Sequence, residues 1–463
     1  MATKTETNNL TQGSTLKTLV RFSLPLLLAN IIQALYGAVD LMIIGKYCLA
    51  DSVAAVSVGT QVTQIITSVI TGMTLGGTIL VGKYIGMQKP EKAKEAIGTT
   101  LTIFAVVSVI LTLIMLCLSG TILTWLQTPD SAFALAHRYV AICSVGIFCI
   151  CGYNAISSIL RGYGDSVRPM IFVAIACMLN IILDLVFVKY LHLDVAGTAL
   201  ATILSQGLSM VFSIVYLNHK HFLFTFRLQN FRINRQLALE LAKLSIPISF
   251  QECMVRLSFL YLTAVVNTFG IYASSAVGIA SKYDVFAMLP ATSIASALSA
   301  ITAQNLGADK PERIRKSVFA GLSIALAMSA CFFAWAQLSP ESMIRLFADD
   351  EKIIATGVPF FRTCSYDYLA VTFVFCLNGF LNGSSKTIFT MISCCFGALA
   401  LRMPLLYLVQ HVFPDSLAML GCVAPTVSGI MAVYTLFYSL KLLAAVSPSH
   451  SLTHRLSARH QSK

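Results

Sequence analysis

The chain has 463 residues, of which 57% are hydrophobic and only 11% are charged, with a formal net charge of +12 and a mean hydropathy of +0.78. A soluble domain carries about 25% charged residues, so the composition excludes an ordinary soluble protein. Apolar runs of about 18 residues or more recur along the chain, and each can span about 30 Å of hydrocarbon. Backbone groups in lipid must be paired within a helix. The sequence therefore predicts an all-α, multi-pass membrane protein.

The predicted elements begin after a polar N-terminal stretch, residues 1–17, which lacks the layout of a cleaved signal peptide. The first apolar run is therefore expected to be a membrane helix that the mature protein keeps. Twelve transmembrane helices fit the pattern of apolar runs, and the tenth and eleventh are the hardest to separate. Their predicted ranges are 18–44, 53–80, 97–118, 138–160, 169–190, 195–217, 244–269, 273–302, 317–338, 357–381, 387–411 and 419–443.

The distribution of lysine and arginine predicts which way the helices face. With both termini in the cytoplasm, 23 basic residues fall on the inner side, 6 on the outer side and 3 within the helices, which accounts for all 32. Cytoplasmic loops of membrane proteins carry such an excess. We therefore expect a protein of the cell membrane with both termini cytoplasmic. Its basic inner loops are expected to contact anionic lipid head groups, and nucleic acid is not expected as a partner.

The second half of the chain repeats the first at an offset of 221 or 222 residues. Three pairs of segments match: Gly86–Lys92 with Gly307–Arg313, Pro25 with Pro247, and Leu160–Gly162 with Leu381–Gly383. Because six helices separate the two copies, both start on the same side of the membrane, as in parallel-repeat transporters. The predicted architecture is two six-helix lobes around a central cleft. The N-lobe covers residues 1–217, a cytoplasmic linker 218–243 and the C-lobe 244–463, and the linker is expected to include an amphipathic helix.

Polar and acidic residues at matching depth in the N-lobe mark the predicted coupling site. Asp40 lies near the outer end of the first helix, Asn180 and Asp184 lie one turn apart on the fifth, and Thr202 lies on the sixth. A carboxylate in hydrocarbon is costly and seldom idle. Two carboxylates with an amide and a hydroxyl form an all-oxygen set that suits a hard cation such as Na⁺, or a shared proton. The alternative is that these aspartates simply reach water from a helix end.

The C-lobe does not repeat this set, since Arg402 occupies the position of Asn180 and Leu406 that of Asp184. This difference predicts one coupling site, in the N-lobe. Glu252 and Arg256 are four residues apart on one helix and are expected to neutralise each other. Asp367, with Lys282 and Asp284, provides further charge for contact with a cationic substrate.

At these residues the chain resembles the multidrug and toxic compound extrusion (MATE) family, and its DNA-damage-inducible subgroup in particular. The resemblance covers about residues 16–443 and is carried by Leu24-Pro25, Gln33, Tyr36, Asp40, Gly45, Arg161–Asp165, Asn180–Asp184, Ala199–Thr202 and Gln304–Ala308. It implies efflux of organic, often cationic, compounds driven by inward Na⁺ or H⁺. Asp40, Asn180, Asp184 and Thr202 match the family's N-lobe cation site.

A hypothetical transport mechanism places the substrate near Gln33, Tyr36 and Asn154 of the N-lobe. Among the charged groups of the C-lobe, Glu252 and Asp367 are the second candidates for contact with a cationic substrate. The chain departs from the branch of the family whose coupling acids lie in the C-lobe, because Val255 and Val371 stand where that branch is expected to have acids. A C-lobe cation site of that type is therefore not expected.

Other functions are disfavoured by particular residues. A lipid-linked oligosaccharide flippase shares the two-lobe plan, but such proteins line the cavity with several cations, and here acids dominate the N-lobe. The Gly162–Asp165 motif of intramembrane aspartyl proteases lies in a basic loop rather than in a helix. The asymmetry of the acids argues against a channel with a symmetric filter. We expect a monomeric transporter of small organic molecules that is not an enzyme, has no cofactor apart from its coupling ion, and keeps its 13 cysteines reduced.

Overall fold

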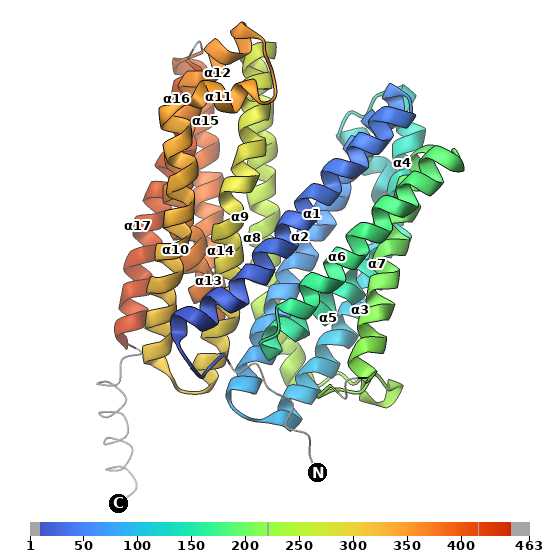
Figure 1. Ribbon diagram of the computed structural model, residues 1–463, viewed down its shortest axis with the longest axis vertical. Coiled ribbons are helices and arrows are strands. Elements are labelled where there is room, and N and C mark those ends of the chain that lie inside the picture. The colour runs from blue at the N-terminus through green and yellow to red at the C-terminus, as the bar shows by residue number, and fades with distance from the viewer. Residues whose placement is uncertain (1–9, 220–221, 415, 446–463) are drawn as a thin grey trace, which may run out of the picture. The chain divides into compact units, whose positions relative to one another are not determined.

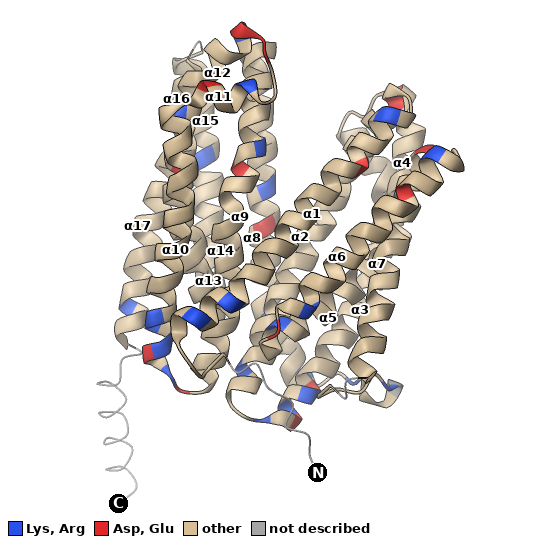
Figure 2. Cartoon of the chain, viewed as in Figure 1, with Lys and Arg blue, Asp and Glu red and all other residues tan. Residues whose placement is uncertain are grey.

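The computed structural model describes residues 10–219, 222–414 and 416–445, and in these residues all regular structure is helical, with no β-strand (Figure 1). This confirms the predicted all-α fold class. Charged residues lie mostly toward the ends of the helices, and the middle parts of the helices consist mostly of uncharged residues (Figure 2). This pattern is the one that a lipid environment requires.

Ten helical segments of the described chain are long and apolar enough to cross a membrane. The pair α4 (Asp130–Val145) and α5 (Ile147–Tyr163), which is bent by 46°, makes an eleventh. The remaining predicted span, 244–269, corresponds to α8 (Arg235–Thr268), a helix of 34 residues. It is less apolar than the others because it carries Glu252 and Arg256 in its membrane portion.

The described chain forms two compact units, and two long helices are divided between them. The first unit contains Leu28–Ser249, and the second contains Leu10–Leu27 with the described residues from Phe250 onward. Helix α1 (Thr15–Tyr47) therefore begins in the second unit and ends in the first, and α8 does the reverse. The units thus do not follow a single division at the predicted linker.

A proline precedes each of these transitions by two residues. Pro25 lies inside α1 and Pro247 inside α8, at positions that correspond in the sequence repeat. Proline cannot donate the backbone hydrogen bond of its turn, and its ring crowds the preceding turn, which weakens the helix there. Each long helix is therefore easiest to bend where it passes from one unit to the other.

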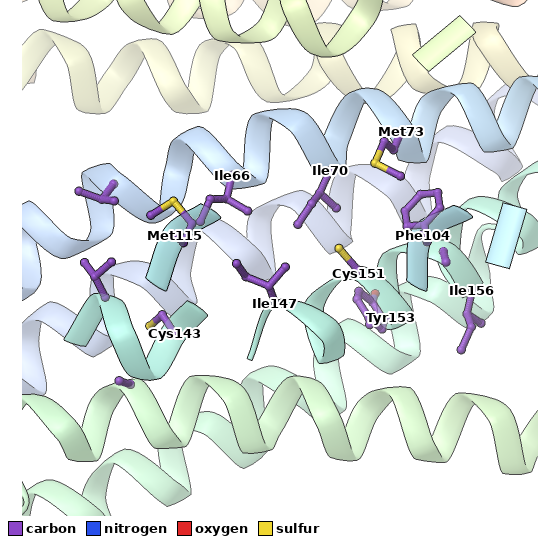
Figure 3. Packing of buried hydrophobic residues seen from close by; sticks show 14 of the residues in the cluster. Ile66, Ile70, Met73, Phe104, Met115, Cys143, Ile147, Cys151, Tyr153 and Ile156 are labelled. Atoms are coloured by element: carbon purple, nitrogen blue, oxygen red, sulfur yellow. The ribbon is translucent and has the colours of Figure 1, made fainter. Parts of the chain in front are cut away.

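The first unit is built on a continuous apolar core. Its remaining elements are α2 (Ala50–Gly86), α3 (Pro90–Trp125), α4, α5, α6 (Val167–Asp184), the π-helix η1 (Leu185–Tyr190), α7 (Asp194–His219) and the 3₁₀ helix η2 (Leu228–Asn230). Figure 3 shows Ile66, Ile70 and Met73 of α2 facing side chains of α3, α4 and α5 such as Phe104 and Ile147. Burial of these side chains positions the helices that carry the polar residues.

The second unit has the same order of long helices with more interruptions. Its elements are α9 (Ile271–Gly307), α10 (Pro311–Leu338), α11 (Pro340–Arg345), α12 (Glu351–Cys364), α13 (Tyr366–Gly383), α14 (Thr387–Cys395), the π-helix η3 (Phe396–Arg402), α15 (Met403–Val412), α16 (Leu417–Gly421) and α17 (Val423–Ala445). The three residues from Ser384 to Lys386 separate α13 from α14, where the sequence alone gave the weakest boundary.

The predicted repeat is confirmed by backbone geometry. Gln88 and Asp309 occupy corresponding loops and both adopt a left-handed conformation, with φ of 56° and 53°. A second pair of corresponding turns has Gly164 and Ser385 at φ of 98° and 60°. Helices α3 and α10 each begin at the proline that follows the first turn. A residue in the left-handed region is a common way to end a helix, so the same chain reversals recur in both halves.

The start of each divided helix is held by hydrogen bonds or an ion pair to another helix of the unit in which it begins. Before α1, the carbonyl oxygens of Leu10 and Gln12 accept hydrogen bonds from Arg313 of α10. At the start of α8, Glu240 pairs with Lys83 of α2 and accepts a hydrogen bond from the Tyr84 hydroxyl at 2.9 Å. These contacts hold the beginnings of α1 and α8 in place.

The helical part of the predicted linker is not a separate helix, because residues 235–243 form the first turns of α8, with Leu237 and Leu241 buried. Between residues 222 and 234 the only helix is the short η2. Phe224 is buried instead, and its ring makes edge contacts with Phe226 and Phe231. The aromatic residues of this segment form a local cluster that packs against α3, next to Gly98. The segment buries these rings without forming a longer helix.

Two corresponding glycines allow a close helix crossing in each unit. A Cβ atom on Gly162 of α5 would lie 2.8 Å from the Thr78 carbonyl oxygen of α2, and one on Gly383 of α13 would lie 2.6 Å from the Ser299 carbonyl oxygen of α9. Thr78 and Ser299 also donate corresponding cross-helix hydrogen bonds, at 3.1 and 2.9 Å. The repeat therefore preserves this contact.

We predict that Gly383→Ala and Gly162→Ala each lower the free energy of unfolding by about 1–3 kcal/mol, because the added methyl group overpacks the crossing. The measurement is the thermal midpoint of the purified protein in detergent. Gly278→Ala in α9 is the control, since a Cβ there meets nothing within 4 Å. Equal midpoints for all three variants would contradict the proposed close contact.

Candidate functional site

Asp40 of α1, Asn180 and Asp184 of α6 and Thr202 of α7 lie together in the first unit. With the Asn180 amide nitrogen facing the carboxyl groups, it donates to Asp40 Oδ1 at 2.8 Å and to Asp184 Oδ2 at 3.3 Å. The amide oxygen then accepts a hydrogen bond from the Thr202 backbone nitrogen at 3.3 Å. This orientation is the one that pairs every polar atom of the amide. Asn180 thus links all three helices.

The two carboxyl groups are buried next to each other. Asp184 and Asn180 are 0% exposed and Asp40 is 8% exposed. The Asp40 and Asp184 carboxyl groups approach within hydrogen-bonding distance, and neither forms a salt bridge with a described basic residue. Two ionised carboxylates in contact repel each other strongly in a poorly solvated site. The arrangement is therefore stable only with a proton or a cation between them.

Further polar groups surround this pair. The Tyr36 hydroxyl donates to Thr202 Oγ1 at 3.3 Å and lies within reach of the Asp40 carboxyl group, one helical turn away on α1. Asp184 Oδ1 is buried without a hydrogen-bond partner among the described residues. Carboxylate, hydroxyl and amide oxygens are the ligands that a hard cation prefers. One carboxyl oxygen of the set is thus left with free bonding capacity.

Local backbone structure helps to place Asp184. It is the last residue of α6, and the π-helical turn η1 follows it directly. A π-helical turn widens the helix and rotates the following side chains, and such turns are frequent at functional sites. The carboxyl group lies inside the unit while the helix continues beyond it. The sequence pattern predicts one regular helix over 169–190 and gives no sign of the π-helical turn.

The predicted substrate residues of the N-lobe are placed differently from one another. Tyr36 belongs to the carboxyl cluster itself. Asn154 of α5 is half-buried, and its amide donates to the Ile150 carbonyl oxygen of its own helix at 2.9 Å. Gln33 is exposed on α1, one turn before Tyr36. Gln33 and Asn154 are therefore not joined to the cluster by a hydrogen bond that the structure records.

In the second unit, acidic residues lie beside cations and hydroxyl groups. Asp367 of α13 is 6% exposed, and its carboxyl group lies within hydrogen-bonding distance of Ser428 and near the Arg402 guanidinium. Glu252 interacts electrostatically with Arg256, four residues further along α8, in the way the spacing predicts. The cation that replaces Asn180 in the repeat thus neighbours an acid from another helix.

One contact of this region was not predicted. The side chain of Tyr368 interacts electrostatically with Asp284 on α9, although Tyr368 is next to Asp367 in sequence. Tyr368 is almost completely buried. Its spacing of one residue from Asp367 gave no signal, because adjacent helical positions point in different directions and the facing helix is 84 residues earlier in the chain.

Comparison with known proteins agrees with the repeat and the fold. The MatE family model matches residues 25–186 and again residues 247–408, a displacement of 222 residues. The chain belongs to the MatE family. It is therefore a membrane transporter and not an enzyme. The family prediction is confirmed, whereas the finer assignment to the DNA-damage-inducible subgroup stays a prediction.

Individual relatives cover most of the chain. It is 28% identical to the probable multidrug resistance protein YpnP of Bacillus subtilis, over 85% of this chain and 88% of that protein. It is 21% identical to the multidrug export protein MepA of Staphylococcus haemolyticus, over 81% and 83% of the two chains. These names do not favour the flippase alternative.

The fold matches solved transporters. A structure described as the outward-facing conformation of a multidrug resistance MATE family transporter superposes with a TM-score of 0.89, covering 96% of this chain and 99% of that one at 22% identity. At this identity the match concerns the fold. The chemistry of this MATE chain has to be argued from its own residues.

We predict that Asn180→Ala lowers the free energy of unfolding by about 1–3 kcal/mol, because two buried carboxyl groups lose their common donor. The thermal midpoint in detergent is the measurement. Asn154→Ala is the control, since that amide donates within its own helix. A midpoint for Asn180→Ala no lower than that of the control would show that the amide does not hold the carboxyl pair.

Proposed function

We propose that this MATE chain is a secondary active antiporter that exports organic, cationic drugs or toxins in exchange for inward Na⁺ or H⁺. The observation that carries the proposal is the contact between the buried Asp40 and Asp184 carboxyl groups. Such a pair needs a positive partner, and a partner that arrives from outside and leaves inside can drive transport. The relatives described as multidrug resistance and export proteins support the substrate class.

The coupling mechanism we propose acts through α1. A Na⁺ ion or a proton that reaches Asp40 and Asp184 neutralises their mutual repulsion and draws the outer part of α1 toward α6. The inner part of α1 packs in the second unit, so this movement is absorbed near Pro25, where the helix is weakest. Bending there changes the positions of the Gln33 and Tyr36 side chains, and the substrate that they contact is released. Alternating access follows from repeating this cycle.

Asn180 can adapt to either candidate ion in this mechanism. When a proton bridges the carboxyl groups, the amide nitrogen donates to both, as in the orientation described above. When Na⁺ occupies the site, turning the amide by half a revolution directs its oxygen to the ion. Both orientations use the same side chain without moving the helix. The set of oxygen ligands therefore fits either ion.

The proposed substrate contacts are the polar groups of Gln33, Tyr36 and Asn154 in the first unit. Glu252 and Asp367 of the second unit are proposed as carboxyl groups for a cationic substrate. A cationic substrate suits buried acids because charges in the membrane need a partner. We further propose that the protein is a monomer in the cell membrane with both termini cytoplasmic, in accord with the 23 basic residues assigned to the inner side.

We predict that Asp40→Asn and Asp184→Asn each abolish drug resistance in a cell that depends on this transporter, while the folded protein remains in the membrane. The amide cannot exchange a proton or neutralise a cation. Asp51→Asn is the control, because that carboxyl group lies at the exposed start of α2, where it accepts a hydrogen bond from Ser131 at 2.9 Å. Full resistance with Asp40→Asn would refute the coupling role.

We predict that uptake of a fluorescent organic cation into proteoliposomes responds to an imposed gradient of either Na⁺ or H⁺, and that Asp184→Asn removes the response. If Na⁺ is the ion, adding it at about 100 times its dissociation constant stabilises the wild type by roughly 2.7 kcal/mol relative to K⁺, by mass action. Asp184→Asn then loses this shift. Uptake at the same rate with and without either gradient contradicts the antiporter mechanism and indicates passive transport, as through a channel.

A further inference from the structure

A groove of about 670 Å³ lies between α6 and α7 in the first unit, at the end where α6 begins and α7 finishes. Most of its lining is apolar or aromatic, and the cationic Arg168 lies at one end together with His219. The other lining residues are Ile171, Phe172, Ile175, Phe212, Val215 and Tyr216. The coupling residues Asn180 and Asp184 lie further along α6 and do not line it.

Arg168 is held in position at the mouth of this groove. Its Nε bonds to Asp165 Oδ2 at 3.0 Å, and its guanidinium lies over the Tyr216 ring at 5.5 Å from the centroid. Asp165 Oδ1 accepts the backbone N–H groups of Val167 and Arg168, at 3.0 and 3.1 Å, so this carboxylate also caps α6. These contacts use one face of the guanidinium and Nε, which leaves its terminal nitrogens able to bind an anion.

The groove floor is fixed by bonds that do not involve the lining cation. Ser209 of α7 donates to the Phe172 carbonyl oxygen at 2.9 Å, and Tyr153 of α5 donates to the Pro169 carbonyl oxygen at 3.1 Å. The side chains of Ile171, Phe212 and Val215 remain 45%, 49% and 56% exposed. A rigid floor with exposed apolar walls is suited to a long hydrocarbon chain.

The second unit differs at the corresponding position. The offset of 221 residues places Phe389 where Arg168 lies in the first unit. The Phe389 ring stacks on Tyr438 and Tyr434, with centroid distances of 3.8 and 5.2 Å. The repeat has therefore replaced the cation by an aromatic ring that packs on its neighbours. The cation at the mouth of this groove is therefore not repeated in the second unit.

We propose that the α6–α7 groove binds an anionic phospholipid of the inner leaflet, with its phosphate at Arg168 and an acyl chain along the apolar walls. Basic pockets between membrane helices at the cytoplasmic side bind anionic head groups. From Arg168 to Ile175 the helix rises about 10 Å, which places the chain of the lipid within the hydrocarbon region while its phosphate stays at the interface. The cation at the mouth and the apolar walls together fit an anionic lipid.

Lipid binding here would support the coupling site mechanically. One wall of the groove is α6, which carries Asn180 and Asp184, and the other is α7, which carries Thr202. A lipid that fills the space between these helices at one end restricts their movement at the other. The proposal is independent of which ion drives transport.

The test uses the purified full-length protein in dodecyl maltoside and native mass spectrometry with phosphatidylglycerol or phosphatidylcholine of identical chains. We expect preferential retention of phosphatidylglycerol, reduced roughly five- to tenfold by Arg168→Gln because one charge contact is lost. Arg315→Gln is the matched control, since its guanidinium also lies over a ring, that of Phe319 at 6.0 Å, but does not line the groove. It should leave retention unchanged.

A second pair of variants tests the acyl-chain part without touching a charge. Val215→Trp fills the groove and should reduce retention, whereas Val433→Trp, at a position of α17 that is 71% exposed, should not. Glycerol 3-phosphate, which has the phosphate but no chain, should not compete. Equal retention of the two lipids, equal behaviour of Arg168→Gln and Arg315→Gln, or competition by glycerol 3-phosphate would overturn the proposal.

Discussion

The contact between the Asp40 and Asp184 carboxyl groups is the constraint on which the rest of this transporter depends. Burial prevents water from screening them, and no described basic residue forms a salt bridge with either. The Asn180 amide donates to both groups. In the antiporter mechanism proposed above, a proton or cation at this pair neutralises the repulsion, and its binding and release shift the packing of α1, α6 and α7.

The two halves of the chain share their backbone and differ in their chemistry. Left-handed turns, helix-starting prolines and glycine crossings recur at one offset, because they determine how helices reverse and how closely they pack. The side chains that carry charge do not recur. Arg402 stands in the place of Asn180, and Phe389 in the place of Arg168. A duplicated scaffold thus supports a proposed ion site and a proposed lipid site in one half, and acids beside cations in the other.

The divided helices connect these local sites to the whole molecule. Helix α1 starts in one compact unit and carries Asp40 in the other, so the proposed mechanism uses this one continuous helix to transmit a change at the carboxyl pair. Pro25 lies close to the transition, and Pro247 repeats this arrangement in α8. A helix weakened at one turn bends there rather than along its length, which localises the movement.

The sequence by itself determined the membrane class, the duplication, the family and the candidate ion residues, since apolar runs, repeated motifs and acids in hydrocarbon are physical requirements of single segments. It could place Asp40, Asn180, Asp184 and Thr202 at similar depth, but not in contact. Tyr36 beside Asp40, Tyr368 beside Asp284 and the π-helical turn after Asp184 were decided only by the tertiary structure. Depth follows from position along one helix, whereas contact depends on how helices far apart in the chain rotate against each other.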